Sequence, residues 1–294
     1  MKALYLVEPG SHLEADRRDF ALIISTSLNN PQNDAIAHRQ PIRETQQIVI
    51  FAGCTVGRTA SRAIDRYRIP FSFIGDKGSI TAHNHLHETP VYAPLQQERN
   101  RDREFCLAFA QSLLRGRWYN AAKVLRDANA KETLDRHLDS LPALSRWNAL
   151  QAWHAETRRC YRKALLSVLE SIATFEAART LAFALLSREL SALLHHAGCS
   201  AAIGTLHKHC QNHQPLPCDL MEQFRPVVEA WLLSNAVVLD NCATFVRQWE
   251  IFMASAIAHP YIGKTNLRDA LAWQVNEYVR AIAETADYRP FLLK

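Results

Sequence analysis

The amino-acid sequence predicts an α+β protein in which a small N-terminal β-sheet domain with one helix precedes a larger all-α domain. Up to about residue 92, short apolar runs alternate with turn residues, which is typical of strands. After about residue 97, apolar residues recur at three- and four-residue spacing, which is typical of helices. The polar stretch 83–102 lies between the two patterns, and its HNHLH sequence (83–87) is predicted to be a linker. We therefore expect domains over 1–93 and 94–294.

Five apolar runs of the N-terminal domain are expected to form strands. They are ALYLV (3–7), FALIIST (20–26), QIVIFA (47–52), FSFIG (71–75) and GSITAH (78–83). One helix is predicted over 55–69, with Thr55 as its N-cap and Pro70 directly after its end.

The second domain is expected to consist of helices joined by short connections. The apolar spacing predicts them over 103–116, 118–130, 147–170, 175–197, 218–234, 238–258 and 265–285. Gly116 and Gly198 are predicted to end the first and the fourth of these helices, because glycine is the preferred residue after a helix C-terminus.

The composition is that of an ordinary globular chain. Of its 294 residues 48% are apolar, which suffices for a sizeable core. No run approaches the ~20 uninterrupted apolar residues of a membrane-spanning helix, and the N-terminus lacks the long apolar core of a signal peptide. Seven scattered cysteines without a CxxC pair favour reduced thiols, so we expect a cytoplasmic protein without membrane contact. The net charge of +5 favours an acidic partner such as nucleic acid, although many soluble proteins are equally basic.

Residues 206–225, LHKHCQNHQPLPCDLMEQFR, combine several side chains that could bind a metal ion. Zinc is one hypothesis, since His207, His209, Cys210, His213 and Cys218 are all competent ligands. Structural zinc sites pair their ligands on tight turns, and of this set only His209 and His213 have such a spacing.

The same segment offers a second set of ligands. Asp219 and Glu222 lie three residues apart, on one face of a helix predicted to start near Cys218. With His207 they would form a mixed oxygen and nitrogen set suited to Mg²⁺ or Mn²⁺. The simpler alternative is that Asp219 only interacts with the helix dipole, that Glu222 is solvated and that His207 is an ordinary loop residue. The spacing alone leaves these alternatives open.

The segment of the candidate ligands extends into two longer stretches, AGCSAAIGTLH (197–207) and PCDLMEQFRPVVEAWLL (217–233). Together they resemble the signature region of the CRISPR-associated integrase and endonuclease family, the Cas-one family. The matching residues are Gly198, Gly204, Leu206, His207, Asp219, Leu220, Glu222, Phe224, Arg225 and Pro226. The segments LYLVEPGSHL and QQIVIFAGCTVGRTASRAIDRYRIPFSFIGDKGSI are similar to the first part of that family, and LLRGRWYNAAKVLR (113–126) is similar to one of its helices, with Arg117 at a lysine position. The family's β-then-α order agrees with the predicted domains.

The sequence departs from the family pattern at the first metal ligand, which is a glutamate in the family. The local counterpart is LQAWHAETRRCY (150–161), which places His154 at the glutamate position. Glu156 follows two residues later and would point roughly 200° away on a helix. Two alternatives stay open: His154 completes a His/His/carboxylate site, or the site has lost its catalytic competence.

The resemblance implies an enzyme that integrates short protospacer duplexes into a CRISPR array by metal-dependent transesterification, acting on double-stranded DNA of the protospacer and the repeat. It implies His207, Asp219 and Glu222 as catalytic residues and metal ligands, together with His154, and Mg²⁺ or Mn²⁺ as cofactor. It also implies a Cas-two-type partner and a homodimer in a larger assembly, with the N-terminal domain in dimer or partner contacts. The DNA-binding candidates are Arg117, Arg158, Arg159, Arg162, Lys163 and Arg225. The alternative is a catalytically impaired family member that serves as a DNA-binding or structural subunit.

Overall fold

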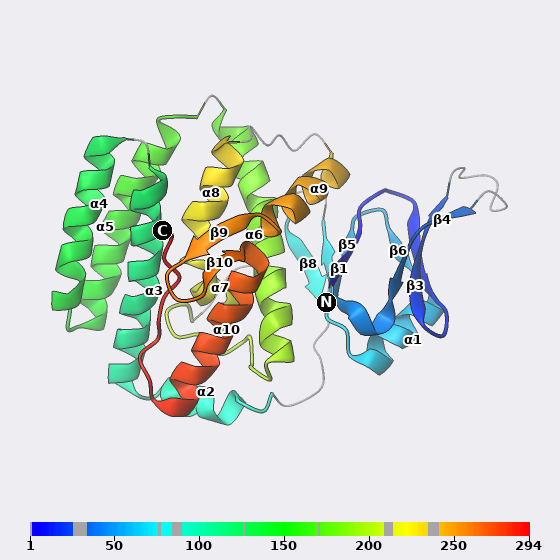
Figure 1. The fold of residues 1–294 in the computed structure, drawn as a ribbon, viewed down its shortest axis with the longest axis horizontal. Coiled ribbons are helices and arrows are strands. Elements are labelled where there is room, and N and C mark those ends of the chain that lie inside the picture. The colour runs from blue at the N-terminus through cyan, green and yellow to red at the C-terminus, as the bar shows by residue number, and fades with distance from the viewer. Residues whose placement is uncertain are drawn as a thin grey trace. The chain divides into compact units, whose positions relative to one another are not determined.

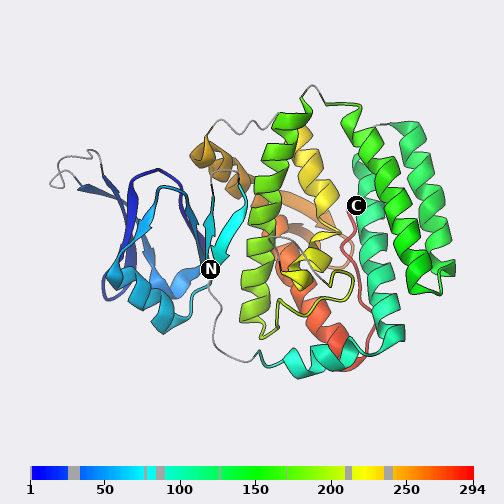
Figure 2. The ribbon, with the colours of Figure 1, turned by 180° about the vertical axis from the view of Figure 1, so that it is seen from behind.

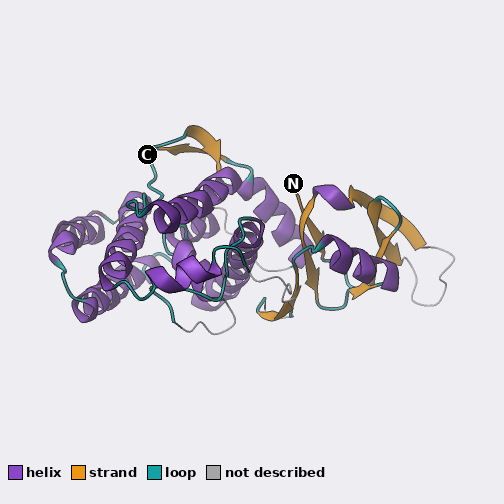
Figure 3. Ribbon diagram, turned by 90° about the horizontal axis from the view of Figure 1, so that it is seen from below, coloured by secondary structure: helices purple, strands orange, loops and turns teal. Residues whose placement is uncertain are grey.

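The computed structural model confirms the α+β class. It describes residues 2–25, 34–75, 78–83, 90–125, 127–169, 171–208, 214–234 and 241–294. The chain forms two compact units, which are Met1–Glu88 with Leu239–Gln248, and Thr89–Val238 with Trp249–Lys294. The first unit is mainly sheet and the second is mainly helical (Figures 1 and 3). The predicted linker HNHLH lies almost entirely outside the described residues.

The first unit contains two four-stranded sheets. One has the order β1 (Lys2–Leu6), β5 (Thr45–Phe51), β7 (Phe71–Ile74) and β8 (Ile80–His83). The other has the order β4 (Asp34–Pro41), β3 (Asp19–Ser25), β2 (Ser11–Ala15) and β6 (Thr55–Val56). Strands β1, β5 and β7 are parallel, and β8 is antiparallel to β7. Leu6, Leu13, Ile48 and Ile50 form part of one apolar core, each 0% exposed.

The helix of this unit, α1 (Arg58–Tyr67), begins later than the sequence predicts. Gly57 is its N-cap, and the expected cap Thr55 belongs to strand β6, which pairs with β2. The apolar runs did not predict strands β2, β4 and β6, because SHLEA and DAIAHRQP contain too few apolar residues to be recognised and β6 has only two residues. These strands form because they pair with neighbouring strands, and their own apolar content is too low to predict them.

The second unit is built around the long helix α6 (Ile172–His196). Contacts join it to α7 (Pro215–Met221), α8 (Arg225–Ser234) and α10 (Leu267–Glu284), as Figure 2 shows. The other helices of this unit are α2 (Ala93–Arg99), α3 (Arg103–Val124), α4 (Ala128–Ser140) and α5 (Trp147–Leu166), with a short 3₁₀ turn over Leu141–Ala143. Helix α9 (Cys242–Met253) is divided between the two units after Gln248, and a second 3₁₀ turn, Ile42–Glu44, belongs to the first unit. Gly198 ends α6 with φ of 75°, as predicted. No helix of the described residues is long and apolar enough to cross a membrane.

Gly116 does not end a helix, contrary to the prediction. Helix α3 runs through it, and a Cβ atom there would lie 3.0 Å from Pro290 Cβ and 3.1 Å from Gln223 Cβ. Glycine at this position therefore allows the C-terminal segment and the residues after α7 to approach α3 closely.

The predicted helices 218–234 and 238–258 also differ from the structure. The first is two helices, because α7 begins at Pro215 and ends at Met221, and α8 begins at Arg225. A proline is tolerated in a first turn, where its missing N–H has no helical partner. The second ends at Met253 and is followed by a hairpin of β9 (Ala256–His259) and β10 (Gly263–Asn266), so the C-terminal unit is not entirely helical.

Candidate nucleic-acid-binding site

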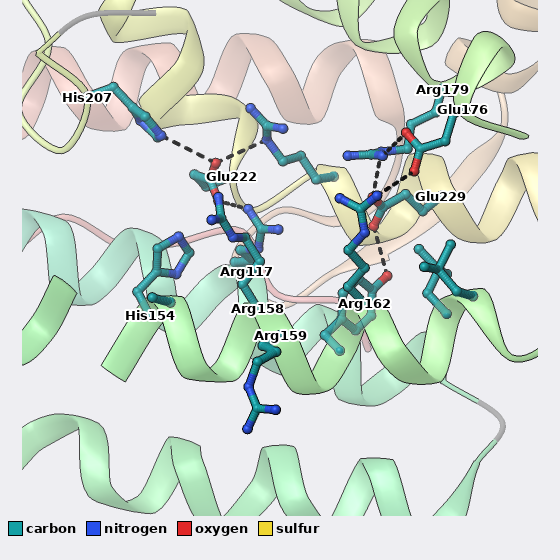
Figure 4. A pocket seen from close by; sticks show the side chains of 15 residues that line it. Arg117, His154, Arg158, Arg159, Arg162, Glu176, Arg179, His207, Glu222 and Glu229 are labelled. Carbon is teal, nitrogen blue, oxygen red and sulfur yellow. Dashed lines mark hydrogen bonds and ion pairs between the residues drawn. The ribbon is translucent and has the colours of Figure 1, made fainter. Parts of the chain in front are cut away.

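A cavity of about 550 Å³ in the helical unit contains most of the candidate site residues (Figure 4). Helices α3, α5, α6 and α8 and the segments on either side of α7 supply its walls. The charged residues and histidines that line it are Arg117, His154, Arg158, Arg159, Arg162, Glu176, Arg179, His207, Glu222, Arg225 and Glu229. Six arginines against three glutamates give this cavity a positive charge.

Helix α5 contributes a row of three side chains to the cavity. His154, Arg158 and Arg162 follow one another at intervals of four residues, which places them on one face of the helix. Leu150 and Tyr161 are buried and pack α5 into the unit. The apolar residues thus fix the helix, and their spacing decides which polar side chains face the cavity.

His207 is held by the buried carboxylate of Asp219. The backbone N–H groups of Thr205, Leu206 and His207 donate to the Asp219 oxygens at 2.6, 3.1 and 2.8 Å. The His207 Nδ1 atom lies 2.8 Å from Asp219 Oδ1. Since an ionised carboxylate only accepts hydrogen bonds, Nδ1 donates, and in a neutral imidazole Nε2 is then the atom that carries the lone pair. That Nε2 atom lies 3.8 Å from Glu222 Oε1.

The backbone before His207 is fixed by close packing. A Cβ atom on Gly204 would lie 2.6 Å from Pro215 Cβ and 2.7 Å from the His207 carbonyl oxygen, so only glycine fits. The Thr205 hydroxyl donates to Asn100 Oδ1 at 2.7 Å, and the Asn100 amide donates to the Gly204 carbonyl at 3.0 Å. The glycine of the sequence motif is thus required for the loop that positions His207.

Glu222 follows α7 and is bound by two arginines. Arg117 of α3 donates to Glu222 Oε2, and Arg225 Nε lies 3.1 Å from Glu222 Oε1. The Arg117 guanidinium stacks over Trp118 at 4.6 Å, and that of Arg225 lies over Phe183 at 4.8 Å. Burial lowers the pKa of Arg117 to about 9, so it is still charged at neutral pH.

His154 lies in the same cavity without a carboxylate partner. Its burial lowers its pKa to about 3, and the positive charges of Arg117 and Arg158 contribute to that shift. Its ring packs against Trp118 at 5.6 Å, and its buried Nδ1 atom has no hydrogen-bond partner among the described residues. His154 is therefore a neutral imidazole at physiological pH.

A second ion-pair network closes the far side of the cavity. Arg179 Nε lies 3.2 Å from Glu229 Oε1, and Tyr161 donates to Glu229 Oε2 at 2.9 Å. Glu176 pairs with Arg179 and, at 3.4 Å, with Arg162. Sequence reasoning missed Glu176, Arg179 and Glu229. The spacing of Glu229, four residues after Arg225, is the signal that would have placed it on the cavity face of α8.

The sequence matches the protein family described as "CRISPR associated protein Cas1" over residues 4–180 and 174–238. These segments cover most of the chain. The protein belongs to this Cas1 family.

Related proteins and structures agree with the family. "CRISPR-associated endonuclease Cas1 3" of Thermus thermophilus is 29% identical over 224 residues, which are 64% of this chain and 67% of that protein. The fold matches a CAS1 protein from Thermotoga maritima with a TM-score of 0.76 and 15% identity, over 100% of both chains. It also matches the "Casposase bound to integration product", with a TM-score of 0.79 and 13% identity over 99% of this chain and 93% of that one. A chain of the "Cas6-RT-Cas1--Cas2 complex" matches with a TM-score of 0.80 and 14% identity, and this protein spans 36% of its length.

Most of the residues chosen from the Cas1 resemblance meet in one cavity. Asp219 does not line it but lies behind His207, and Lys163 is exposed on α5 outside it. Glu156 pairs with Arg159 at 2.6 Å, does not line the cavity and cannot stand in for the missing glutamate. The zinc candidates His209, Cys210 and His213 lie outside the described residues.

The arrangement does not fit a Mg²⁺ centre. Mg²⁺ prefers oxygen ligands, and the three glutamates that line the cavity are each bound to arginine. Both Asp219 oxygens accept hydrogen bonds from the loop before His207. Among the described residues, no three His, Cys, Asp or Glu side chains lie together in a way that could hold one metal ion.

Proposed function

We propose that this protein acts in CRISPR adaptation by binding duplex DNA, with a phosphate of one strand in the arginine-lined cavity. The excess of arginines over glutamates around His207 carries this proposal. Arg158 lines the cavity and makes no ion pair with a described residue, so its guanidinium is available to a ligand. Membership of the Cas1 family, and the integration product named in the casposase title, support DNA as that ligand.

The arginines suit phosphate by their chemistry. A guanidinium group presents several N–H donors in a fixed plane, which matches two phosphate oxygens at once. Arg117 and Arg225 are held in place by Glu222, so they lose little conformational freedom when a ligand binds. Arg158 and Arg162 reach the cavity from α5 and extend this positive surface (Figure 4).

Duplex binding by Arg158→Gln tests this function. Each phosphate contact contributes to affinity and to its salt dependence, so we expect roughly tenfold weaker binding and a salt slope lower by about one. Fluorescence anisotropy with a short labelled duplex measures both. The matched control is Arg136→Gln, because Arg136 is an exposed arginine of α4 outside the cavity. Equal affinities of the two variants would contradict the proposal.

The proposed assembly includes a homodimer and a Cas2-type partner. Two of the matching structures are titled as Cas1–Cas2 complexes, which supports the partner. We assign the dimer and partner contacts to the N-terminal sheet unit. Light scattering of the protein alone, and co-elution with a Cas2-type protein, check both statements. A monomer that does not co-elute would contradict them.

Strand transfer is the second candidate function, and the orientation of His207 favours it. Asp219 fixes Nδ1, and Nε2, which carries the lone pair of a neutral imidazole, faces Glu222 in the cavity. A partly buried, oriented imidazole of this kind is suited to a role in proton transfer or ligation. Nothing in the DNA-binding proposal requires such an orientation.

The test is integration of a short duplex into a repeat, measured with Mg²⁺, with Mn²⁺ and with chelator. If His207 takes part, wild type is active and His207→Ala is inactive. Equal activity of the two proteins would remove His207 from the reaction. Inactive wild type that still binds DNA tightly would leave the DNA-binding function as the only one.

A further inference from the structure

Arg117, Glu222 and Arg225 form a compact cluster, named here the arginine clamp. Both oxygens of Glu222 are engaged, because Oε2 accepts from Arg117 and Oε1 lies 3.1 Å from Arg225 Nε. The Glu222 side chain is only 3% exposed, so water screens these contacts weakly. One buried carboxylate thus holds two guanidinium groups.

The clamp arginines are fixed in position and do not belong to a mobile surface. The Arg117 side chain is 7% exposed and stacks on Trp118, which itself is 0% exposed. The Arg225 side chain is 19% exposed and lies over Phe183. Each charge is therefore held by an ion pair on one side and an aromatic ring on the other.

The surroundings of the clamp disfavour a divalent cation. Two positive charges already neutralise Glu222, and a cation would have to displace at least one of them. The other cavity glutamates are bound to Arg179, and His154, at the position of the family's glutamate, supplies no negative charge. A hard cation therefore finds no unpaired carboxylate among the described lining residues.

We propose that the arginine clamp takes the place of a divalent cation in this protein and offers its fixed positive charge to a DNA phosphate without a metal ion. This inference rests on the proposed DNA-binding function for the identity of its ligand. It extends that function by assigning the charge at the site to Arg117 and Arg225.

Isothermal titration with Mn²⁺ tests the clamp independently of DNA. Wild type is expected to show no saturable binding. Arg225→Gln is expected to gain binding of one equivalent, because Glu222 Oε1 and His207 Nε2 then become available together. Arg225 is partly exposed, so this variant is expected to fold, and its thermal melting is compared with wild type. Saturable micromolar Mn²⁺ binding by wild type would overturn the inference.

Duplex binding with chelator and with Mn²⁺, at matched ionic strength, gives the second measurement. Wild type is expected to bind equally well in both, and Arg225→Gln is expected to bind about tenfold more weakly in chelator, since a charge-assisted hydrogen bond is lost. Arg117→Lys keeps the charge but loses the planar fork, and a similar loss is expected from it.

Different results would overturn the arginine clamp and the DNA-binding function. Wild-type binding that disappears in chelator would overturn the clamp inference and leave the DNA-binding function intact. Wild type that binds no duplex under either condition would overturn the DNA-binding function, and the Mn²⁺ titration would then decide alone whether the clamp excludes a cation.

Discussion

The two units of this protein bury polar side chains of different kinds. Among the described residues, the sheet unit buries serine, threonine and glutamine but no aspartate, glutamate, lysine or arginine. The helical unit buries Arg117, Arg188, Glu189, Asp219, Glu222, Glu229 and Glu277. Removing a charge from water is costly unless the charge is paired. The sheet unit is therefore organised around apolar packing, and the helical unit carries the free-energy cost of burying charges.

Four of these buried charges lie at the cavity or directly behind it. Arg117, Glu222 and Glu229 line it, and Asp219 orients His207. Replacing buried ion pairs by apolar residues is often neutral or stabilising, so stability alone does not account for them. We infer that these four charges are buried in the helical unit because the site uses them.

Asp219→Ala is the largest expected test of this difference. Three backbone N–H groups and an imidazole lose their buried acceptor, so the free energy of unfolding is expected to fall by about 3–5 kcal/mol. Urea denaturation measures it. The control is Asp16→Ala in the sheet unit, because Asp16 also accepts two backbone N–H groups and pairs with Arg39 but is exposed. A comparable loss in the control would remove burial as the cause.

Ile50→Ala tests the apolar core of the sheet unit. Ile50 is 0% exposed in the core of the sheet unit, so the cavity left behind is expected to lower the free energy of unfolding by about 2–5 kcal/mol. The duplex affinity of the folded protein is expected to stay unchanged, measured at a temperature where the variant is folded. A weaker affinity would show that the sheet unit contributes to the DNA site.

Gly116→Ala tests whether the close packing against α3 requires a glycine. The added methyl group would crowd Pro290 and Gln223, and overpacking is expected to lower stability by about 1–3 kcal/mol, which exceeds the gain in helix propensity. Thermal or urea unfolding measures the change. Increased stability would show that Pro290 and Gln223 can move away from the added methyl group without a loss of free energy.

The pH dependence of stability has a contribution from His259 of the hairpin. Burial lowers its pKa to about 4 from the ordinary value of 6.5, so the unfolded chain binds this proton more readily than the folded chain. Stability is therefore expected to fall as the pH drops from about 6.5 towards 4. His259→Phe keeps an aromatic ring beside Trp273 and is expected to lose less stability over that range. Parallel pH profiles of the two proteins would contradict this assignment.

Strong local patterns made much of the fold predictable from sequence. The runs around β5 and β7 and the periodicities of α5, α6 and α10 gave elements close to the observed ones. The short strands β9 and β10 were missed because AIAH and GKTN show no clear alternation of apolar and polar residues. They also lie at the border of two segments with helical periodicity. The break between α7 and α8 was missed because a three-residue turn preserves the helical spacing of apolar residues on either side.

The candidate site was predictable only where its residues lie in one motif. His207, Asp219, Glu222 and Arg225 share a segment whose order and spacing are specific, and the family match supports that segment. Glu176 and Arg179 come from α6, outside the segments whose motifs resemble the family. Their relation to Glu229 depends on helix packing, which no short spacing encodes.

The sequence by itself determined the family, the order of sheet and helical units, and the residue types available for the site. Those properties follow from local periodicity and from a contiguous motif. Only the tertiary structure decided that Asp219 serves His207, that Arg117 of α3 binds Glu222, and that His154 faces the same cavity. These pairings depend on which helix faces meet in the folded unit, and ion pairs between distant segments form only after apolar packing has brought them together.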